Sequence, residues 1–425
     1  MAIWYVEFGL NTILLFFFNA QNLLSERQYG FRKDRSTELA IFNLLSKILP
    51  AIEHKKYAIC LFLDFASCFD TIDRAILCSK FDCYGVRNEN LNLIKSYFYN
   101  RRQYVYYGEG ISKIAGQNLG VVQGSRLGPL MFDIYSNDFN NLFQNDINIL
   151  YADDACLVYI GDDIETLIRH VNDQLTMVNE WCKANKLSLN HTKSEFMLIT
   201  NRSVTVTPKI KIGNNEISRV ESFKYLGINI DSSLKFQTHI DHLKSRLSQI
   251  CGVTYRLKSF LDLKSAKKLY YSCAYSIVGY CIATYGGVSQ CTQRMNPLIR
   301  LQHRIVKNIF SRFYPASTNL FKDVEILKIP EIYKLRVAVL MYRVLKLGEC
   351  PTLQNILYLQ TPQHTYETRF SNELILPFPR VETIRMCFQY QFASVWNSIP
   401  SFIKDCTSIR LFKKSLSNYF LNSYV

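Results

Sequence analysis

Residues 149–158 read ILYADDACLV and place two adjacent carboxylates, Asp153 and Asp154, inside an apolar run typical of a buried strand. Aspartate is depleted from strands, and a buried charge without a partner is costly. The pair therefore indicates either a turn between two strands or a site that binds a positive group. If NILY (148–151) and CLVYI (156–160) pair as a hairpin, the two carboxylates lie at its tip. Alternate residues of a strand face opposite sides, so both point at one place only if the turn redirects one of them.

A second carboxylate closes another buried run. The segment LFLDF (61–65) ends the apolar stretch 57–65, and its charged member is Asp64. Mg²⁺ prefers oxygen ligands and is usually held by a few carboxylates together with substrate phosphates. Two such ions about 4 Å apart catalyse phosphoryl transfer. Carboxylate pairs are also common at ordinary turns, so spacing alone favours a structural turn over a metal site.

Composition points to a folded protein with a polyanionic partner. The chain has 425 residues, 48% of them hydrophobic, and a net charge of +15. This composition excludes a disordered chain and favours nucleic acid as partner, ahead of a membrane surface. The stretch 244–312 holds twelve Lys and Arg residues against the single acidic residue Asp262, with tyrosines interleaved at 255, 270, 271, 275, 280 and 285. It predicts a basic helical groove for nucleic acid, although a solvated helix face over a tyrosine-containing core gives the same pattern.

The thirteen cysteines show no CxxC pair and no zinc-ligand spacing, which favours reduced cysteines of an intracellular protein. The apolar run ILLFFF (13–18) is too short to span a bilayer, and no positive segment precedes it. We therefore expect residues 1–18 to be a structural or non-native leader, with a signal anchor as the alternative, and no integral membrane association.

Local patterns predict alternating helices and strands, which is an α/β or α+β arrangement. Ser36 or Thr37 is the predicted N-cap of a helix that runs to Leu49. A buried strand is expected over 57–65, with helices over 71–85 and near 163–185. The segment 120–143 is predicted to form a Gly-rich turn followed by a helix.

Six motifs in order resemble the reverse transcriptases of non-LTR (LINE-type) retrotransposons, especially the jockey-like lineages. They are SERQYGFRKDRSTELAI (25–41), LDFASCFDTID (63–73), GVVQGSRLGPLMFDIYSNDF (120–139), YADD (151–154), NKLSLNHTKSEFML (185–198) and FKYLGINID (223–231). The tail FASVWNSIPSFIKDCTSIRLFKKSL (392–416) is also similar to that family. The resemblance implies an α+β right-hand polymerase, with an antiparallel palm sheet backed by helices, a helical thumb and a mixed C-terminal region. It implies fingers and palm over 19–230, a basic thumb over 231–312 and a C-terminal region over 313–425.

The resemblance also implies roles for individual residues. Two Mg²⁺ ions would be held by Asp64 and Asp153, with Asp154 less direct because its strand parity differs, and by the backbone carbonyl of Phe65. Lys193 would protonate the pyrophosphate leaving group, although a lysine before a strand is usually only solvated. Asp70 is expected to cap a helix rather than bind metal.

The remaining implied roles concern nucleotide and primer. Nucleotide contacts are assigned to Arg32, Arg35, Phe69, Gln123 and Gly124. Phe69 would exclude a ribose 2′-OH, or else be an ordinary core residue, and Arg35 fits a surface position equally well. Gln123 and Gly124 also fit an ordinary turn before a helix. The primer grip is assigned to Tyr225, Leu226 and Gly227, where strand packing is the alternative.

Some features depart from the family pattern. Val122 stands where the family usually has Pro, and Arg126 stands where it has a small apolar residue. The leader replaces an earlier fingers segment, so we expect a chain truncated at its N-terminus, without endonuclease, RNase H or zinc-knuckle regions. The expected partners are an RNA template, a DNA primer or target DNA, and dNTPs. The expected location is the nucleus or a cytoplasmic ribonucleoprotein. The alternative is a catalytically silent remnant that only binds nucleic acid.

Overall fold

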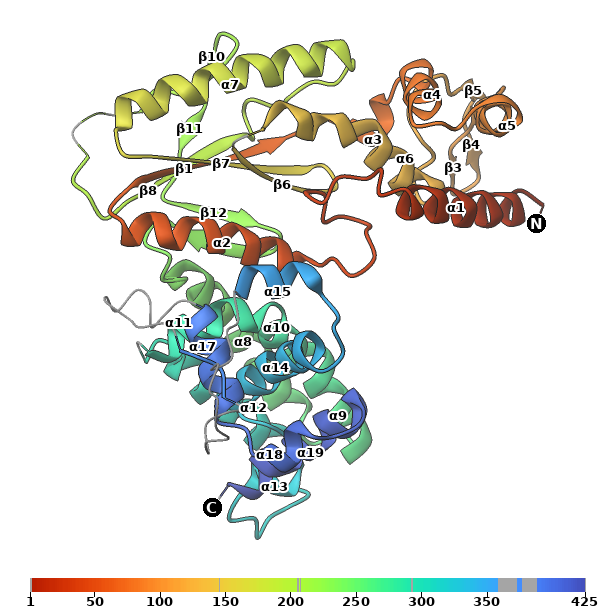
Figure 1. Ribbon diagram of the computed structural model, residues 1–425. Helices are drawn as coiled ribbons and strands as arrows, with labels where there is room; N and C mark the ends of the chain where they lie inside the picture. The colour runs from red at the N-terminus through yellow and green to blue at the C-terminus, as the bar shows by residue number, and fades with distance from the viewer. Residues whose placement is uncertain are drawn as a thin grey trace. The chain divides into compact units, whose positions relative to one another are not determined.

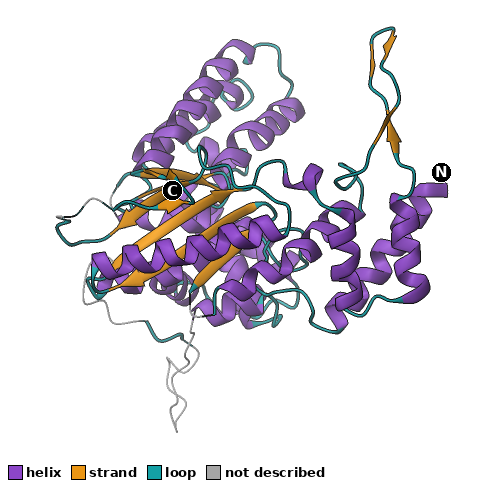
Figure 2. Cartoon of the chain, turned by 90° about the horizontal axis from the view of Figure 1, so that it is seen from above, coloured by secondary structure: helices purple, strands orange, loops and turns teal. Residues whose placement is uncertain are grey.

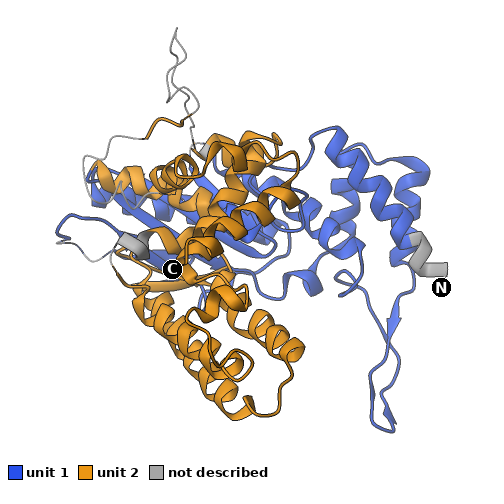
Figure 3. Cartoon of the chain, turned by 90° about the horizontal axis from the view of Figure 1, so that it is seen from below, with its two compact units in different colours: residues 1–40, 55–220 blue, residues 41–54, 221–425 orange. Residues whose placement is uncertain are grey.

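The computed structural model describes residues 2–424 apart from 145, 205, 207, 292, 358–372 and 377–387. The chain forms two compact units, residues 1–40 with 55–220 (unit 1) and residues 41–54 with 221–425 (unit 2; Figure 3). Unit 1 combines helices with the main sheet, and unit 2 is mostly helical (Figure 2). The fold class is α+β, as the sequence predicted.

A five-stranded sheet organises unit 1, in the order β11-β8-β1-β7-β6. Its strands are β1 (Tyr57–Asp64), β6 (Ile147–Tyr151), β7 (Asp154–Gly161), β8 (Glu195–Ile199) and β11 (Ser218–Arg219). The pairs β1–β7, β1–β8 and β6–β7 are antiparallel, and only the two-residue strand β11 pairs in parallel, with β8. The predicted antiparallel sheet is therefore present, with its most buried strand, β1, in the centre.

Helices and short strands complete unit 1. The helices are α1 (Ala2–Ala20), α3 (Cys68–Thr71), α4 (Arg74–Cys83), α5 (Asn88–Phe98), α6 (Leu127–Ser136) and α7 (Ile164–Ala184), with a 3₁₀ helix over Asn137–Leu142. The short strands are β2 (Arg102–Gln103), β3 (Tyr106–Tyr107), β4 (Gly110–Ile111), β5 (Ala115–Gly116), β9 (Lys211–Ile212) and β10 (Asn215–Glu216). Helix α7 lies along one face of the sheet (Figure 1) and buries Val171, Leu175 and Val178 in the unit's core.

The apolar segment at the N-terminus is part of this core. Leu10, Leu14 and Phe18 follow one another at four-residue spacing on α1 and are buried. The ring of Phe18 packs edge-on against Phe81 and Tyr84 of the α4 region. The leader is therefore a packed helix of unit 1. None of the described helices is long and apolar enough to cross a membrane.

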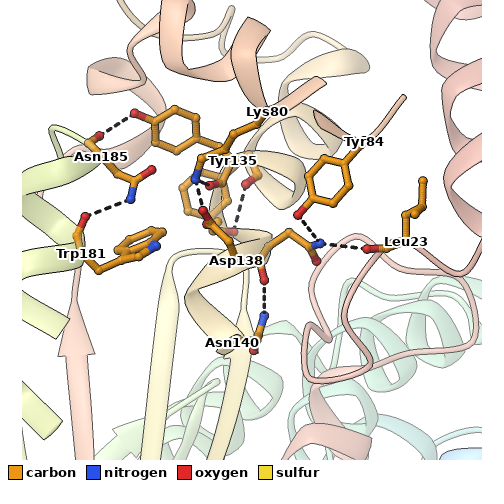
Figure 4. A network of polar contacts seen from close by, with 11 residues as sticks. Leu23, Lys80, Tyr84, Tyr135, Asp138, Asn140, Trp181 and Asn185 are labelled. Carbon is orange, nitrogen blue, oxygen red and sulfur yellow. Dashed lines mark hydrogen bonds and ion pairs between the residues drawn. The ribbon is translucent and has the colours of Figure 1, made fainter. Parts of the chain in front are cut away.

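Polar contacts fix α4, α6 and α7 against one another (Figure 4). Lys80 of α4 donates hydrogen bonds to the carbonyl of Tyr135 at 2.5 Å and to the carboxylate of Asp138 at 2.8 Å. The hydroxyl of Tyr135 donates to the carbonyl of Asn185, just beyond α7. The ammonium group of Lys80 also lies 5.3 Å from the Trp181 ring centre. A single cation thus links α4 to the end of α6, to the 3₁₀ helix that follows it and to α7.

The described residues of unit 2 form a hairpin and a set of helices, the first of which, α2, begins in unit 1. The hairpin is β12 (Ser222–Tyr225) with β13 (Ile228–Asp231). The helices are α2 (Thr37–Glu53), α8 (Gln237–Leu257), α9 (Leu263–Leu269), α10 (Ser276–Gly279), α11 (Ile282–Cys291), α12 (Asn296–Phe310), α13 (Leu320–Asp323), α14 (Ile329–Leu345), α15 (Pro351–Leu357), α17 (Phe388–Asn397), α18 (Ser401–Lys404) and α19 (Ile409–Asn422), with a π-helical turn at Tyr270–Tyr275.

The unit 2 predictions fare differently. Residues 237–310 are mainly helical, as expected for the basic stretch. Of its tyrosines, Tyr270 and Tyr285 are buried core residues whereas Tyr255 is 60% exposed, and the nucleic-acid groove stays a prediction. The C-terminal region, expected to be mixed, is helical over its described residues, and 358–372 and 377–387 lie outside them. Among the described cysteines, Cys60, Cys68, Cys156, Cys182 and Cys251 are buried thiols.

Candidate active site

Two of the three predicted carboxylates lie opposite each other on adjacent strands of the sheet. Asp64 ends β1, Asp154 begins β7, and the two are direct partners in the antiparallel register. Directly opposed residues project on the same face with Cβ atoms about 5 Å apart. Asp153 lies in the two-residue turn before β7, together with Ala152, whose φ is +54°. Because alternate strand residues face opposite sides, the sequence left open which of the two adjacent carboxylates lies beside Asp64. In the structure Asp154, and not Asp153, is the cross-strand neighbour of Asp64.

The three charges influence one another. Partial burial, and then the charges of Asp153 and Asp64, raise the pKa of Asp154 to about 6. Burial, together with Asp153 and Asp64, also raises the pKa of the thiol of Cys68, which begins α3. All three carboxylates therefore concentrate negative charge at one end of the β1–β7 pair.

This set of oxygens fits a magnesium site that needs substrate to complete it. Among the described residues, no three His, Cys, Asp or Glu side chains are grouped closely enough to hold an ion by themselves. Mg²⁺ typically takes only one or two carboxylates from protein and fills its octahedron with phosphate oxygens and water. The opposed carboxylates of Asp64 and Asp154 supply two such ligands, and the carboxylate of Asp153 lies in the adjoining turn.

Two residues of the 25–41 motif to which the sequence assigned no role, Gln28 and Gly30, support the YADD turn. The side-chain oxygen of the buried Gln28 accepts hydrogen bonds from the backbone N–H groups of Gly30 at 2.8 Å and Ala152 at 3.1 Å. The backbone of Tyr29 also donates to the carbonyl of Leu150 at 2.7 Å, in β6. A Cβ added at Gly30 would lie 2.3 Å from the Ala152 nitrogen. The available sequence signal for this contact was the glutamine and the glycine of QYG (28–30). Their burial beside apolar strands is seen only in the structure.

Lys193 lies near the carboxylates, and its implied role as a proton donor stays a prediction. Its ammonium group lies 3.9 Å from a carboxylate oxygen of Asp64, and its side chain is 70% exposed. The loop that carries it is attached to the end of β1, because Asn190 N–H donates to the Asp64 carbonyl at 2.8 Å and Asp64 N–H donates to Ser194 Oγ at 3.2 Å. The loop thus holds the lysine at the acidic end of the sheet.

Phe65 and Phe69 differ in exposure. The Phe65 ring is buried and packs edge-on with Phe139 and Trp181, as expected of a core ring. The Phe69 ring is partly exposed and stacks on Phe132 of α6 at a centroid distance of 4.7 Å. The ring of Phe31, next to Arg32, meets it edge-on at 6.4 Å. Phe69 is therefore a partly exposed ring that packs against two aromatic neighbours.

Asp70 is not a helix cap, contrary to the sequence prediction. It lies within α3, and its carboxylate accepts a hydrogen bond from Gln123 Nε2 at 2.7 Å. The cap of α4 is Asp73, whose carboxylate accepts from the N–H groups of Ala75 and Ile76. For this reason the predicted helix 71–85 begins at Arg74, with α3 separate from it. Gly124, beside Gln123, has φ +80°, a left-handed conformation that favours glycine.

The two predicted arginines lie on the segment that supports the turn. Arg32 is half-buried and donates to the Ser25 carbonyl at 3.1 Å, and its charge opposes the strong rise that burial causes in the pKa of Asp133. The guanidinium of Arg35 lies 5.0 Å from the Tyr29 ring centre. Asp133, a buried acid on α6, was not identified from the sequence.

The three residues predicted to form a primer grip lie in unit 2. Tyr225 is buried at the end of β12, and Leu226 and Gly227 form the hairpin turn with φ of +46° and +83°. Two consecutive left-handed residues are typical of the tight turn that the twist of a hairpin favours. The hydroxyl of Tyr280 donates to the Leu226 carbonyl at 2.8 Å. Tyr280 stabilises this turn, a role that the spacing of the tyrosines did not indicate.

Comparison with known proteins supplies the family. Residues 9–230 match the family described as reverse transcriptase (RNA-dependent DNA polymerase), so the match begins within the predicted leader. The chain is 28% identical over 332 residues to the probable RNA-directed DNA polymerase from transposon BS of Drosophila melanogaster, covering 73% of this chain and 35% of that protein. It is 27% identical over 318 residues to the RNA-directed DNA polymerase from mobile element jockey of Drosophila funebris, covering 72% and 34%. The chain thus spans about a third of the length of these relatives.

Among solved structures, the chain is similar to telomerase from Candida albicans in complex with a TWJ fragment of telomeric RNA. The similarity has a TM-score of 0.40 at 14% identity, over 75% of this chain and 56% of that one.

Proposed function

Because the chain belongs to the reverse transcriptase family, we propose that it is the RNA-directed DNA polymerase of a non-LTR retrotransposon and extends a primer 3′-OH with dNTPs on an RNA template. Membership gives it the right-hand polymerase fold, with which its α+β content and antiparallel sheet agree. The observation that carries the proposed activity is the register that opposes Asp64 and Asp154, with Asp153 in the adjoining turn.

Two Mg²⁺ ions are proposed to bind Asp64, Asp153 and Asp154, with the carbonyl of Phe65 as a further ligand. When bound, such ions stabilise charge on the attacking and leaving oxygens of phosphoryl transfer. Burial, and then the charges of Asp153 and Asp64, raise the pKa of Asp154, and a bound cation would offset both effects.

The other residues are proposed to orient the nucleotide. The partly exposed ring of Phe69 is proposed to lie against the sugar, where it would clash with a 2′-OH. Gln123 and the turn at Gly124 are proposed to contact the base or the template. Arg32 and Arg35 have the planar donor groups that suit a triphosphate. Lys193 is proposed to donate a proton to the leaving pyrophosphate, since its ammonium already lies beside Asp64.

The unit 2 hairpin is proposed to grip the primer through Tyr225, Leu226 and Gly227, and the basic stretch 231–312 to bind duplex as the thumb. The proposed partners are an RNA template and a DNA primer or target DNA. The proposed location is intracellular, in the nucleus or a cytoplasmic ribonucleoprotein.

Primer extension on an RNA template tests the activity. The assay compares the chain with Asp153→Ala and with Asp162→Asn, a matched control at the far end of β7, where the exposed Asp162 pairs with Lys56. We expect extension that needs Mg²⁺, is lost in Asp153→Ala and is retained in Asp162→Asn. If the unaltered chain binds duplex with steep salt dependence but never extends a primer, it is a silent binding remnant and the proposal fails.

A further inference from the structure

A two-stranded ribbon between α5 and α6 exposes aromatic side chains on both faces. Residues 102–103 pair with 115–116, and 106–107 pair with 110–111, within unit 1. Figure 2 shows the ribbon extending away from the neighbouring helices. Tyr104, Tyr106 and Tyr107 are 60%, 67% and 89% exposed. Exposed apolar side chains gathered on one element are typical of an interaction site. A two-stranded ribbon is only marginally stable by itself, and rings exposed to water add nothing to its stability.

The base of the ribbon is firmly attached. The guanidinium of Arg74 donates to the carbonyls of Gly120 at 2.9 Å and Leu119 at 3.0 Å, and also to that of Gln117. A Cβ added at Gly120 would lie 2.6 Å from the carbonyl oxygen of Asp70. The ribbon is therefore anchored directly beside α3, which carries Phe69 and Asp70.

A polar cavity of about 750 Å³ lies at this base. Its lining includes the Asp70–Gln123 pair and the side chains of Arg101, Arg102, Gln103, Gln117 and Asn118. Side-chain amides present a donor and an acceptor together, as the edge of a nucleobase does, and guanidinium groups suit phosphates. The cavity joins the ribbon to Gln123, one of the proposed nucleotide contacts.

We propose that this ribbon and cavity bind an unpaired strand of nucleic acid: one base enters the cavity, and the following bases stack on Tyr104 and Tyr106. Tyr104 lies between β2 and β3 and Tyr106 lies in β3, two positions further along, so an extended backbone separates their Cα atoms by at most about 7 Å. Bases stack about 3.4 Å apart, so one base fits between the two rings. The ribbon carries Arg101, Arg102 and Lys113 against Glu109, a charge that favours a polyanion over an acidic protein surface. The inference rests on the proposed function only for identifying that strand as template.

Fluorescence anisotropy with labelled nucleic acid tests the proposal without any polymerisation. The full chain is titrated with a blunt RNA–DNA duplex and with the same duplex carrying an unpaired 5′ RNA extension. We expect tighter binding of the extended duplex, and a loss of that preference in the double variant Tyr104→Ala/Tyr106→Ala. Stacking of one base supports roughly a 5- to 150-fold change in affinity. Tyr104→Phe/Tyr106→Phe, which keeps the rings, and Phe402→Ala, which removes a 71% exposed ring of α18, should retain the preference.

Equal preference for the extension in the double alanine variant would overturn the inference. So would unchanged RNA binding with altered self-association in sedimentation velocity, because the ribbon would then be a protein contact. Because the two rings are exposed, we expect their removal to leave the fold intact, and an unchanged Tm of the double alanine variant checks this. A preference for the extension without primer extension sinks only the proposed function, and primer extension without the preference sinks only this inference.

Discussion

The side chain of Gln28 accepts a hydrogen bond from the backbone of Ala152, 124 positions later in the chain, and so holds the turn that carries Asp153. The same oxygen accepts from Gly30, so one buried amide satisfies two backbone donors. The 25–41 motif and the YADD motif (151–154) are thus held together by a direct hydrogen bond, although they are far apart in the sequence.

Replacing Gln28 by leucine should weaken both the fold and the reaction. The change leaves two N–H groups without this acceptor, and each unsatisfied buried group costs about 1–3 kcal/mol. We expect the free energy of unfolding in urea to fall by about 2 kcal/mol or more, and the rate of primer extension to fall with it. Gln237→Leu removes an exposed amide that bonds Asp241 and should change neither. Equal stability of the two variants would contradict this role.

Gly30→Ala should displace the YADD turn. The added methyl would lie 2.3 Å from the Ala152 nitrogen, so the backbone of one segment must move, at a cost of about 1–3 kcal/mol. The matched control is Gly252→Ala in α8, where the added Cβ meets no atom within 4 Å and should be neutral or slightly stabilising. Thermal unfolding and primer extension measure both effects, and a fully active Gly30→Ala would show that the turn tolerates the shift.

Lys193→Gln separates catalysis from stability. The Lys193–Asp64 pair is largely exposed, and such pairs contribute about 1 kcal/mol or less, so Tm should barely change. If the lysine donates a proton to pyrophosphate, the single-turnover rate should fall about 100-fold or more, with little change in the Kd of dNTP. Lys186→Gln, which removes an exposed partner of Asp73, is the control. A fall of only two- to threefold would remove Lys193 from the chemistry.

The pKa of Asp154 predicts a pH dependence of stability in metal-free buffer. Its pKa is about 6 in the folded chain against an ordinary value of 3.8, so the unfolded state loses this proton first as pH rises. Asp154 therefore contributes a growing loss of stability between about pH 4 and 6, which is complete above that range. Asp154→Asn should remove the contribution, so urea unfolding at pH 4, 5, 6 and 7 should show a variant progressively more stable than the parent. Parallel pH curves would rule out the perturbed carboxyl.

Lys80→Met should destabilise unit 1. The lysine is largely buried, and its loss deprives Asp138 and the Tyr135 carbonyl of their shared donor. Breaking a buried ion pair by removing one partner costs about 3 kcal/mol, although the partial exposure of Asp138 moderates that figure. Lys56→Met breaks the exposed pair with Asp162 and should cost less than about 1 kcal/mol. Similar losses in the two variants would mean that the Lys80 network adds no more than a surface pair.

The sequence by itself determined the family, the α+β class and the positions of the carboxylates. Those features depend on local chemistry: apolar runs that must be buried, caps and turns with particular residues, and motifs whose order is fixed along the chain. The predicted helix near 163–185 appears as Ile164–Ala184, and the predicted strand 57–65 as Tyr57–Asp64, because each has a clear apolar pattern.

Only the tertiary structure decided which groups meet. Asp154 opposes Asp64 because of the register between strands ninety positions apart, and shifting a register by one residue turns a side chain to the other face. Asp70 bonds Gln123 instead of capping a helix because Gly120 brings the start of the 120–139 motif against α3. The roles of Gln28 and Arg74 are likewise contacts with backbone far along the chain. Such pairings depend on how strands and loops pack in three dimensions, and no local pattern of residues encodes them.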